Sequence, residues 1–318
     1  APSRGDVRLP GRRREVAFLV GGSTVACAPQ GLRNWLVGDF VDAMPDRSVI
    51  LQWMPRPSPP ERPAFRPTLA LDPLLTRAAA RARLAPLSSQ AEAAVRRIVT
   101  ELVHRVDARL TDDHAATISD AAIAQERLRP HVERSFGHVM DRVQPRLVLM
   151  EDAAYGWWAS LIALMKARGI RVVEPQHGWI GPSHAAYNYG AAAQRPELSV
   201  TIPDELLTFG DYWSRGVRFP GLVTAIGKAN IEEMTASAVP MEQRPLEILV
   251  VSSTSDPEGL SDLTIALVDC LPAAWTVRFR PHPAERAAGW KRGNRNPVFD
   301  EAEVQRMTRA GVERLVQM

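Results

Sequence analysis

Short apolar runs alternate with helical patterns from the start of the chain. Residues 16–20 (VAFLV) form an apolar run that leads into a Gly-Gly-Ser turn at 21–23, which is typical of a buried strand. A helical pattern around 35–43 and a second apolar run at 48–53 (SVILQW) follow. Such alternation of strands and helices favours a parallel sheet covered by helices.

Two long stretches interrupt this alternation. Residues 55–67 contain six prolines, which lack a donor N–H and restrict the preceding residue, so we expect a surface loop there. A proline-rich ligand for a partner domain is the alternative. Residues 74–143 carry Ala, Arg, Leu and Val at helical spacing, most clearly at 91–106 and 131–143, and predict helices.

A strand, a helix and a second strand are predicted next. The strand at 146–150 (RLVLM) precedes a helix at 155–168, which Gly169 ends, and the strand 170–174 (IRVVE) follows. Crossovers of this kind are right-handed in nearly all cases, so both strands should be parallel. Their carboxyl ends should therefore open on the same edge of the sheet.

The rest of the chain predicts a second Rossmann-like domain. Two short strands expected at 205–209 and 222–226 still belong to the first domain. A polar stretch at 230–244 then separates them from the strand 246–251, the helix 257–270 and the strand 275–280 of the second domain. We therefore expect two Rossmann-like domains whose parallel sheets face a central cleft. The predicted divisions are a basic tail at 1–14, an acceptor domain at 15–229, a linker at 230–244 and a donor-nucleotide domain at 245–318.

Composition narrows the class of protein. Of the 318 residues, 45% are hydrophobic and 24% are charged, which fits a globular protein rather than a disordered one. The net charge of +3 arises largely from the first fourteen residues, a short arginine-rich stretch for which we predict no nucleic-acid partner. The two cysteines are far apart, and no apolar run reaches the roughly 18 residues needed to span a bilayer. We expect a cytoplasmic protein, with peripheral association at the inner face of the membrane as a possibility left open.

Polar residues follow both strands of the central unit. Glu151 and Asp152 follow the first strand, and Gln176 and His177 follow the second. Ligands of parallel sheets bind beyond the carboxyl ends of strands, so these side chains should face one crevice. Asp152 also lies where it could cap the next helix, and both roles remain open.

The ordinary pKa of histidine lies near neutrality, which suits a general base, so His177 is a candidate catalytic base. Asp152 is the alternative candidate. A histidine that only bonds a neighbouring loop is the alternative. Downstream, His184 and Tyr187 lie in a loop rich in rings and hydroxyls that could hold a sugar or simply pack together.

In the second half, two sites could bind phosphate. Ser252, Ser253 and Thr254 lie between a strand and a helix, where hydroxyl and N–H groups suit an anion, although helix capping alone would explain them. Arg280 and His282 end the next strand, and an arginine fork binds phosphate oxygens well. A turn with a salt bridge is the alternative.

Three segments together resemble bacterial surface-polysaccharide glycosyltransferases of the GT-B fold. They are 174–189 (EPQHGWIGPSHAAYNY), 203–213 (PDELLTFGDYW) and 280–283 (RPHP). RPHP in particular is similar to the His-Pro motif of capsule sialyltransferases, Kdo transferases and teichoic-acid glycerophosphotransferases. The resemblance covers about residues 140–285, and the chain has only 35 residues after Pro283, from 284 to 318, so we expect a shortened second domain.

The resemblance implies residue roles. His282 would contact the donor phosphate with support from Arg280, and the Ser252 loop would help to hold it. An amino-domain residue would activate the acceptor hydroxyl, and we favour His177 narrowly over Asp152. Glu151 would join His177 and Asp152 in the catalytic group and, with Gln176, His184 and Tyr187, would shape the acceptor side.

The resemblance also implies a reaction. It is inverting transfer of a sugar or polyol phosphate from a nucleotide-activated, CMP- or CDP-linked donor to a glycan acceptor in capsule polysaccharide biosynthesis. No cofactor is expected, and no metal, because the sequence contains no D-x-D pair. The alternatives are a nucleotide-sugar epimerase on the same fold and a non-catalytic scaffold of a polysaccharide assembly complex.

Overall fold

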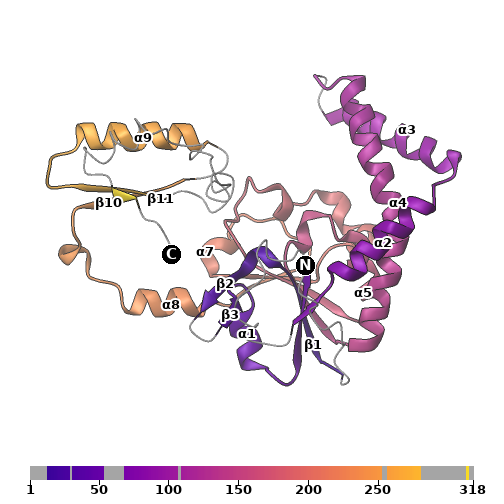
Figure 1. Cartoon of the computed structure of the whole chain (residues 1–318), viewed down its shortest axis with the longest axis horizontal. Coiled ribbons are helices and arrows are strands. Elements are labelled where there is room, and N and C mark those ends of the chain that lie inside the picture. The colour runs from indigo at the N-terminus through magenta and orange to yellow at the C-terminus, as the bar shows by residue number, and fades with distance from the viewer. Residues whose placement is uncertain are drawn as a thin grey trace. The chain divides into compact units, whose positions relative to one another are not determined.

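The structure is a computed structural model, and it describes residues 13–28, 31–53, 68–106, 109–252, 256–280 and 313–314. The chain divides into two compact units, Ala1–Glu232 and Glu233–Met318. The first unit contains a seven-stranded sheet and the second a three-stranded sheet (Figure 1).

All strands of the seven-stranded sheet are parallel. Their order is β5-β4-β1-β6-β7-β8-β9, so all seven carboxyl ends open on one edge. The prediction of an α/β fold built on a parallel sheet is confirmed. The strands span Val16–Gly21 (β1), Ser48–Trp53 (β4), Thr68–Ala70 (β5), Leu147–Met150 (β6), Arg171–Pro175 (β7), Glu205–Thr208 (β8) and Leu222–Ala225 (β9).

The direction of winding reverses at the centre of this sheet. From β1 the chain moves outward to β4 and β5, then returns to place β6 on the other side of β1 and continues to β9. In open parallel sheets, ligands bind preferentially beyond the strand ends at such a reversal. Gly21 ends β1 and Glu151 directly follows β6, so both lie at this point.

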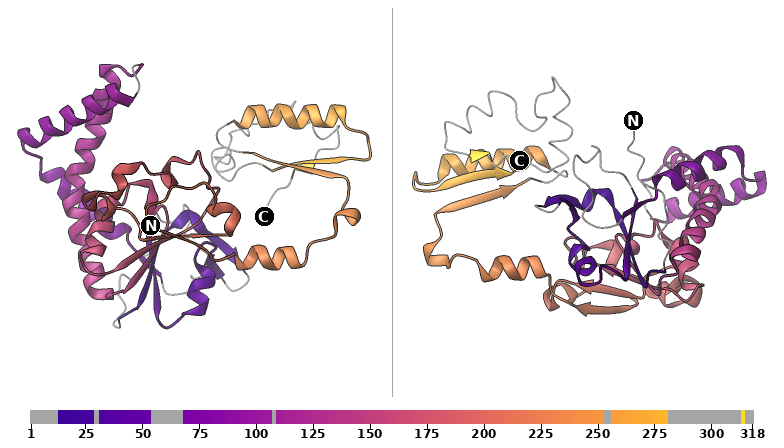
Figure 2. Two further views of the ribbon diagram at one scale, coloured as in Figure 1. Left: turned by 180° about the vertical axis from the view of Figure 1, so that it is seen from behind. Right: turned by 60° about the horizontal axis from the view of Figure 1, so that its bottom comes forward.

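Helices cover both faces of the sheet. Helices α2, α3 and α4 follow one another between β5 and β6, and α3 with the start of α4 extends beyond the sheet (Figure 2). The longer helices span Gly38–Ala43 (α1), Asp72–Leu84 (α2), Ser89–Val106 (α3), Asp112–Val143 (α4), Ala159–Lys166 (α5) and Ala229–Ala236 (α8). Single turns of helix occur at Pro196–Ser199 (α6) and Asp211–Ser214 (α7).

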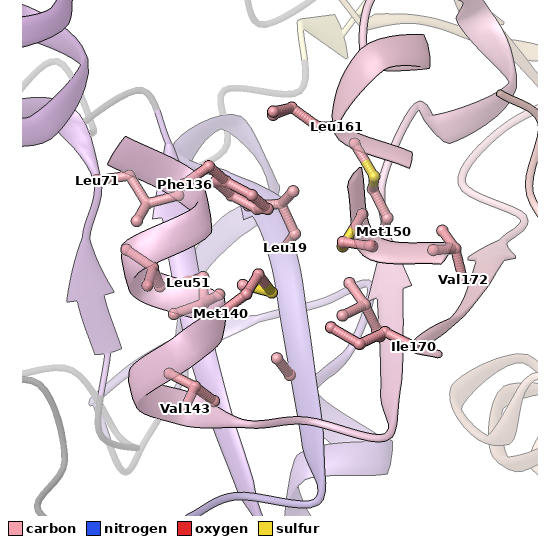
Figure 3. Packing of buried hydrophobic residues seen from close by; sticks show 14 of the residues in the cluster. Leu19, Leu51, Leu71, Phe136, Met140, Val143, Met150, Leu161, Ile170 and Val172 are labelled. Carbon is pink, nitrogen blue, oxygen red and sulfur yellow. The ribbon is translucent and has the colours of Figure 1, made fainter. Parts of the chain in front are cut away.

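The long helix α4 has clear signals at both ends. Thr111 and His114 form a reciprocal capping box at its start. Gln144 ends it in the left-handed conformation, with φ of 50°. The final turns of α4 bury Phe136, Met140 and Val143 against the sheet, as Figure 3 shows.

The two faces of β1 contact different helices. Ala17 and Leu19 belong to the core beneath α4 and α5, whereas Phe18 and Val20 pack with Val41 of α1 on the opposite face. A strand covered on both faces needs apolar residues at every position, which explains why 16–20 is continuously apolar. Full burial of each such side chain stabilises the fold by roughly 1.5–3 kcal/mol.

The structure corrects three expected elements. The helix expected around 35–43 is shorter, because an antiparallel hairpin of Val25–Ala28 (β2) and Gly31–Asn34 (β3) precedes it. The helix expected from residue 155 begins at Ala159, after a 3-10 turn and Gly156 with φ of 80°. The range expected as a linker contains most of α8.

The second unit is a smaller parallel sheet with one long helix. Strand β11 (Thr276–Arg280) pairs with β10 (Glu247–Val251) and with the two-residue β12 (Glu313–Arg314). Helix α9 (Pro257–Cys270) packs on this sheet through a small core. The buried residues of that core are Val250, Ile265, Val277 and Phe279.

Candidate functional site

Glu151 joins the ends of β1 and β6. Its Oε2 accepts hydrogen bonds from the Gly21 backbone N–H at 2.6 Å and from the Thr24 hydroxyl at 3.3 Å. Burial raises the pKa of Glu151 to about 7, against the lowering effect of the Gly21 hydrogen bond. Glu151 is buried and braces the turn after β1, and the catalytic role expected of it stays a prediction.

The turn after β1 is held by a second buried polar residue. The Asn34 side-chain amide donates to Thr24 Oγ1 at 2.7 Å, and its carbonyl accepts from the backbone N–H groups of Leu36 and Val37 at 3.0 Å. Buried polar groups of this kind are stable only when they are paired. Asn34 and Thr24 were not recognised in the sequence, because their pairing depends on the β2–β3 hairpin.

Asp152 and His177 meet across the ends of β6 and β7. His177 Nε2 lies 3.1 Å from Asp152 Oδ1. Asp152 occupies the left-handed region with φ of 58°, and its side chain makes no cap hydrogen bond. The alternative prediction, that this side chain caps the next helix, is therefore wrong. A non-glycine residue in this conformation is held there by its surroundings. The expected meeting of these two residues at one sheet edge is found.

The two members of this pair differ in access. The His177 side chain is 20% exposed, and its other nitrogen, Nδ1, is buried 3.8 Å from Glu174 Oε1. The Asp152 side chain is 34% exposed and lines a pocket. Asp152 is thus the more exposed member of the pair and the one that lines a pocket, and on this ground we prefer it to His177 as the candidate base.

The protonation state of His177 suits a supporting role. Burial lowers its pKa more than the neighbouring Asp152 carboxylate raises it. A neutral imidazole at pH 7 donates one N–H, and Asp152 Oδ1 is the acceptor at Nε2. His177 thus orients the carboxylate without cancelling its negative charge.

Glu174 is a buried acid of this site that the sequence patterns did not reveal. It is fully buried at the end of β7, where its carboxyl group accepts from the Ala154 N–H at 2.6 Å and from the Tyr187 hydroxyl at 2.7 Å. Burial raises its pKa to about 8, against these two hydrogen bonds. The available signal in the sequence was a single acidic residue directly after the apolar pair Val172 and Val173 in IRVVE.

Two residues expected to contact an acceptor have structural roles. Tyr187 is fully buried and directed at Glu174. Gln176 is also buried, and its side chain donates to the Gly178 carbonyl at 2.8 Å and accepts from the Phe209 N–H at 2.7 Å. It thereby ties the end of β7 to the end of β8. Neither side chain is free to contact an acceptor.

His184 remains at the surface beside a pocket of about 650 Å³. Its Nε2 lies 3.1 Å from the Tyr155 hydroxyl, and both residues line the pocket. The other lining residues are mostly alanines and other small or apolar side chains.

A second pocket, of about 610 Å³, is lined by Asp152 itself, and we call it the tryptophan pocket. It shares Gly156 and Ala159 with the first pocket, so the two are adjacent. Its aromatic lining residues are Trp53, Trp157 and Trp158.

In the second unit, two predicted phosphate ligands lie together. The Ser252 N–H donates to the Arg280 carbonyl at 2.9 Å, across the ends of β10 and β11. The helix that follows is capped by Asp256, whose carboxylate accepts from the Gly259 N–H at 3.0 Å. That negative charge disfavours phosphate at the helix terminus itself. Ser253, Thr254 and His282 lie outside the described residues.

Within the described ranges, we find neither a metal-binding cluster nor a membrane-spanning helix. No group of three or more His, Cys, Asp or Glu side chains there is arranged to hold a metal ion. Among the helices that are described, none combines the length and apolar character needed to cross a bilayer.

Comparison with known proteins finds distant similarity. No protein-family model matches the chain, and no curated protein matches it in sequence. Among solved structures, the crystal structure of a calicheamicin glycosyltransferase is similar at 11% identity, with a TM-score of 0.37. The match covers 96% of this chain and 70% of that chain. Similarity at this level assigns no family to the chain.

Proposed function

We propose that this chain is a metal-independent glycosyltransferase that inverts the configuration of a nucleotide-activated sugar, with Asp152 as the general base. The observation that carries the proposal is the Asp152–His177 pair at the carboxyl edge of β6 and β7, whose Asp152 side chain lines a pocket. The sequence resemblance to GT-B transferases supports it.

In this mechanism Asp152 removes the proton from an acceptor hydroxyl. The acceptor oxygen then forms a bond to the anomeric carbon, and the bond from that carbon to the donor phosphate breaks. The electron pair leaves with the nucleotide phosphate. His177 holds the Asp152 carboxylate by donating from Nε2, and a positioned base of this kind contributes about 10²–10⁴-fold to rate.

The departing phosphate is assigned to the second unit. Arg280 has the planar fork of donors that suits phosphate oxygens, and Ser252 ends the neighbouring strand. The resemblance assigns the same task to His282. The strand pairing of β10 and β11 supports the joint use of Arg280 and Ser252, because it brings their backbones together.

Thermal-shift measurements on the full chain with CMP, CDP, UDP and GDP test the proposal. A nucleotide that binds only the folded state raises the melting temperature. At a concentration one hundred times its Kd, it increases the free energy of unfolding by about 2.7 kcal/mol. We expect at least one of the four to stabilise the protein, with cytidine nucleotides strongest. Absence of any shift would favour the scaffold alternative, and turnover of a donor without an acceptor would favour the epimerase.

A further inference from the structure

The tryptophan pocket is built from elements far apart in the sequence. Trp53 comes from the end of β4, Leu75 from α2, and the turn after β6 contributes Asp152. Helix α4 supplies one wall and the start of α5 another. The α4 residues that line it are Ala122, Gln125, Glu126, Leu128, Arg129 and Val132.

Its walls are aromatic and partly exposed. Trp53 and Trp158 pack edge to face, with ring centroids 5.2 Å apart. Trp157 also lines the pocket and is 83% exposed. A tryptophan this exposed leaves a large apolar surface in water, and a planar ligand that stacks on it would remove that cost.

The polar groups of the pocket are few and unevenly engaged. The Arg129 guanidinium is committed to Glu126 and Glu133, with distances of 2.5 Å and 3.0 Å. In contrast, the Trp53 Nε1–H is buried and has no hydrogen-bond partner within the part of the chain that the structure describes. A buried donor without a partner costs free energy until it meets an acceptor atom. The pocket thus presents aromatic and apolar walls beside the Asp152 carboxylate, with Gln125, Glu126, Arg129 and Ser160 as its other polar lining residues.

We propose that the tryptophan pocket binds the acceptor, and that the acceptor is a planar, ring-bearing compound with a hydroxyl group. This rests on the proposed function, because Asp152 is the base that takes the hydroxyl proton. The volume of about 610 Å³ fits a molecule of two or three rings. A glycan chain, which the sequence resemblance implies as acceptor, carries many hydroxyl groups, whereas most of the side chains that line this pocket are apolar or aromatic.

The test is calorimetric binding to the intact chain, with 7-hydroxyflavone as the ring-bearing probe and maltotriose as the glycan probe. We expect saturable binding of 7-hydroxyflavone to one site and no binding of maltotriose. Trp157→Ala should weaken flavone binding about tenfold, because it removes one stacking face. Trp179→Ala is the matched control, since Trp179 is also exposed but does not line this pocket, and it should leave the affinity unchanged.

A second variant, which fills the pocket, keeps the test informative if Trp157→Ala fails to fold. Gln125 is exposed on α4, so Gln125→Trp should fold and should block the pocket, with loss of flavone binding. Unchanged affinity in both Trp157→Ala and Gln125→Trp, or binding of maltotriose in preference to the flavone, would overturn the proposal. Nucleotide stabilisation is measured separately, so failure here with stabilisation intact leaves the transferase standing. Flavone binding without any nucleotide effect would instead refute the transferase.

Discussion

Two pairs of adjacent parallel strands, β6 with β7 and β10 with β11, end in contrasting chemistry. The first pair ends in buried acids and a neutral imidazole, with Asp152 the accessible group. The second ends in Arg280 beside a serine. The same backbone arrangement therefore presents an accessible carboxyl group at the first edge and an arginine at the second, and we propose a different task for each. Side chains at strand ends, rather than the fold, decide which task an edge performs.

The largest effect is expected from removing the proposed base. Asp152→Asn keeps a residue that tolerates the left-handed conformation and removes the negative charge, so it separates chemistry from backbone strain. We expect kcat to fall about 10²–10⁴-fold with donor binding unchanged. Steady-state kinetics on the transfer reaction measures this. His177→Asn should lower kcat less than Asp152→Asn does. An equal or larger fall in kcat for His177→Asn would instead make His177 the base.

The buried acids of the first edge should make stability depend on pH. The pKa of Glu174 is about 8 in the folded state against 4.5 as its ordinary value, so the folded state binds more protons between those values. The free energy of unfolding should therefore fall as pH rises from about 5 to 8, with a limit of about 1.4 kcal/mol per pH unit for one proton. Glu151, with a pKa of about 7, acts in the same direction.

Glu174→Gln removes one of these two titrations and keeps the shape of the side chain. Urea unfolding at pH 5, 6.5 and 8 should show a shallower decline than in the unaltered protein. The matched control is Glu205→Gln, which alters an acid that is paired with Arg171 at the start of β8. Its decline in unfolding free energy from pH 5 to 8 should match that of the unaltered protein. Parallel profiles for Glu174→Gln and the unaltered protein would contradict the assignment.

The smallest effect is expected at the second edge. Arg280→Ala should weaken the binding of a stabilising nucleotide about tenfold, because one charge-assisted contact to phosphate is lost. Arg278→Ala is the control, since Arg278 lies on the same strand and pairs with Glu247 at 3.3 Å. Calorimetry with the nucleotide identified by thermal shift compares the two. Equal losses would place the phosphate elsewhere.

Local sequence patterns predicted most of the strands. Runs such as 48–53 and 257–270 match β4 and α9 at both ends, because periodicity and capping act within a few residues. The β2–β3 hairpin was missed, since each strand has only four residues and β3 (GLRN) contains a single apolar side chain. The placement of Asp152 and His177 at one edge also followed from the sequence, because parallel strands share their carboxyl edge.

Side-chain burial and long-range pairing were decided by the tertiary structure. The burial of Glu174 and Tyr187 depends on the loop that folds back over β7, so a sequence cannot separate them from exposed neighbours. The tryptophan pocket joins Trp53 to Asp152 and to α4 across about a hundred residues of chain. Local propensity determines where elements begin and end, whereas contacts between distant elements determine which polar groups lose water, and that loss sets their pKa and their accessibility.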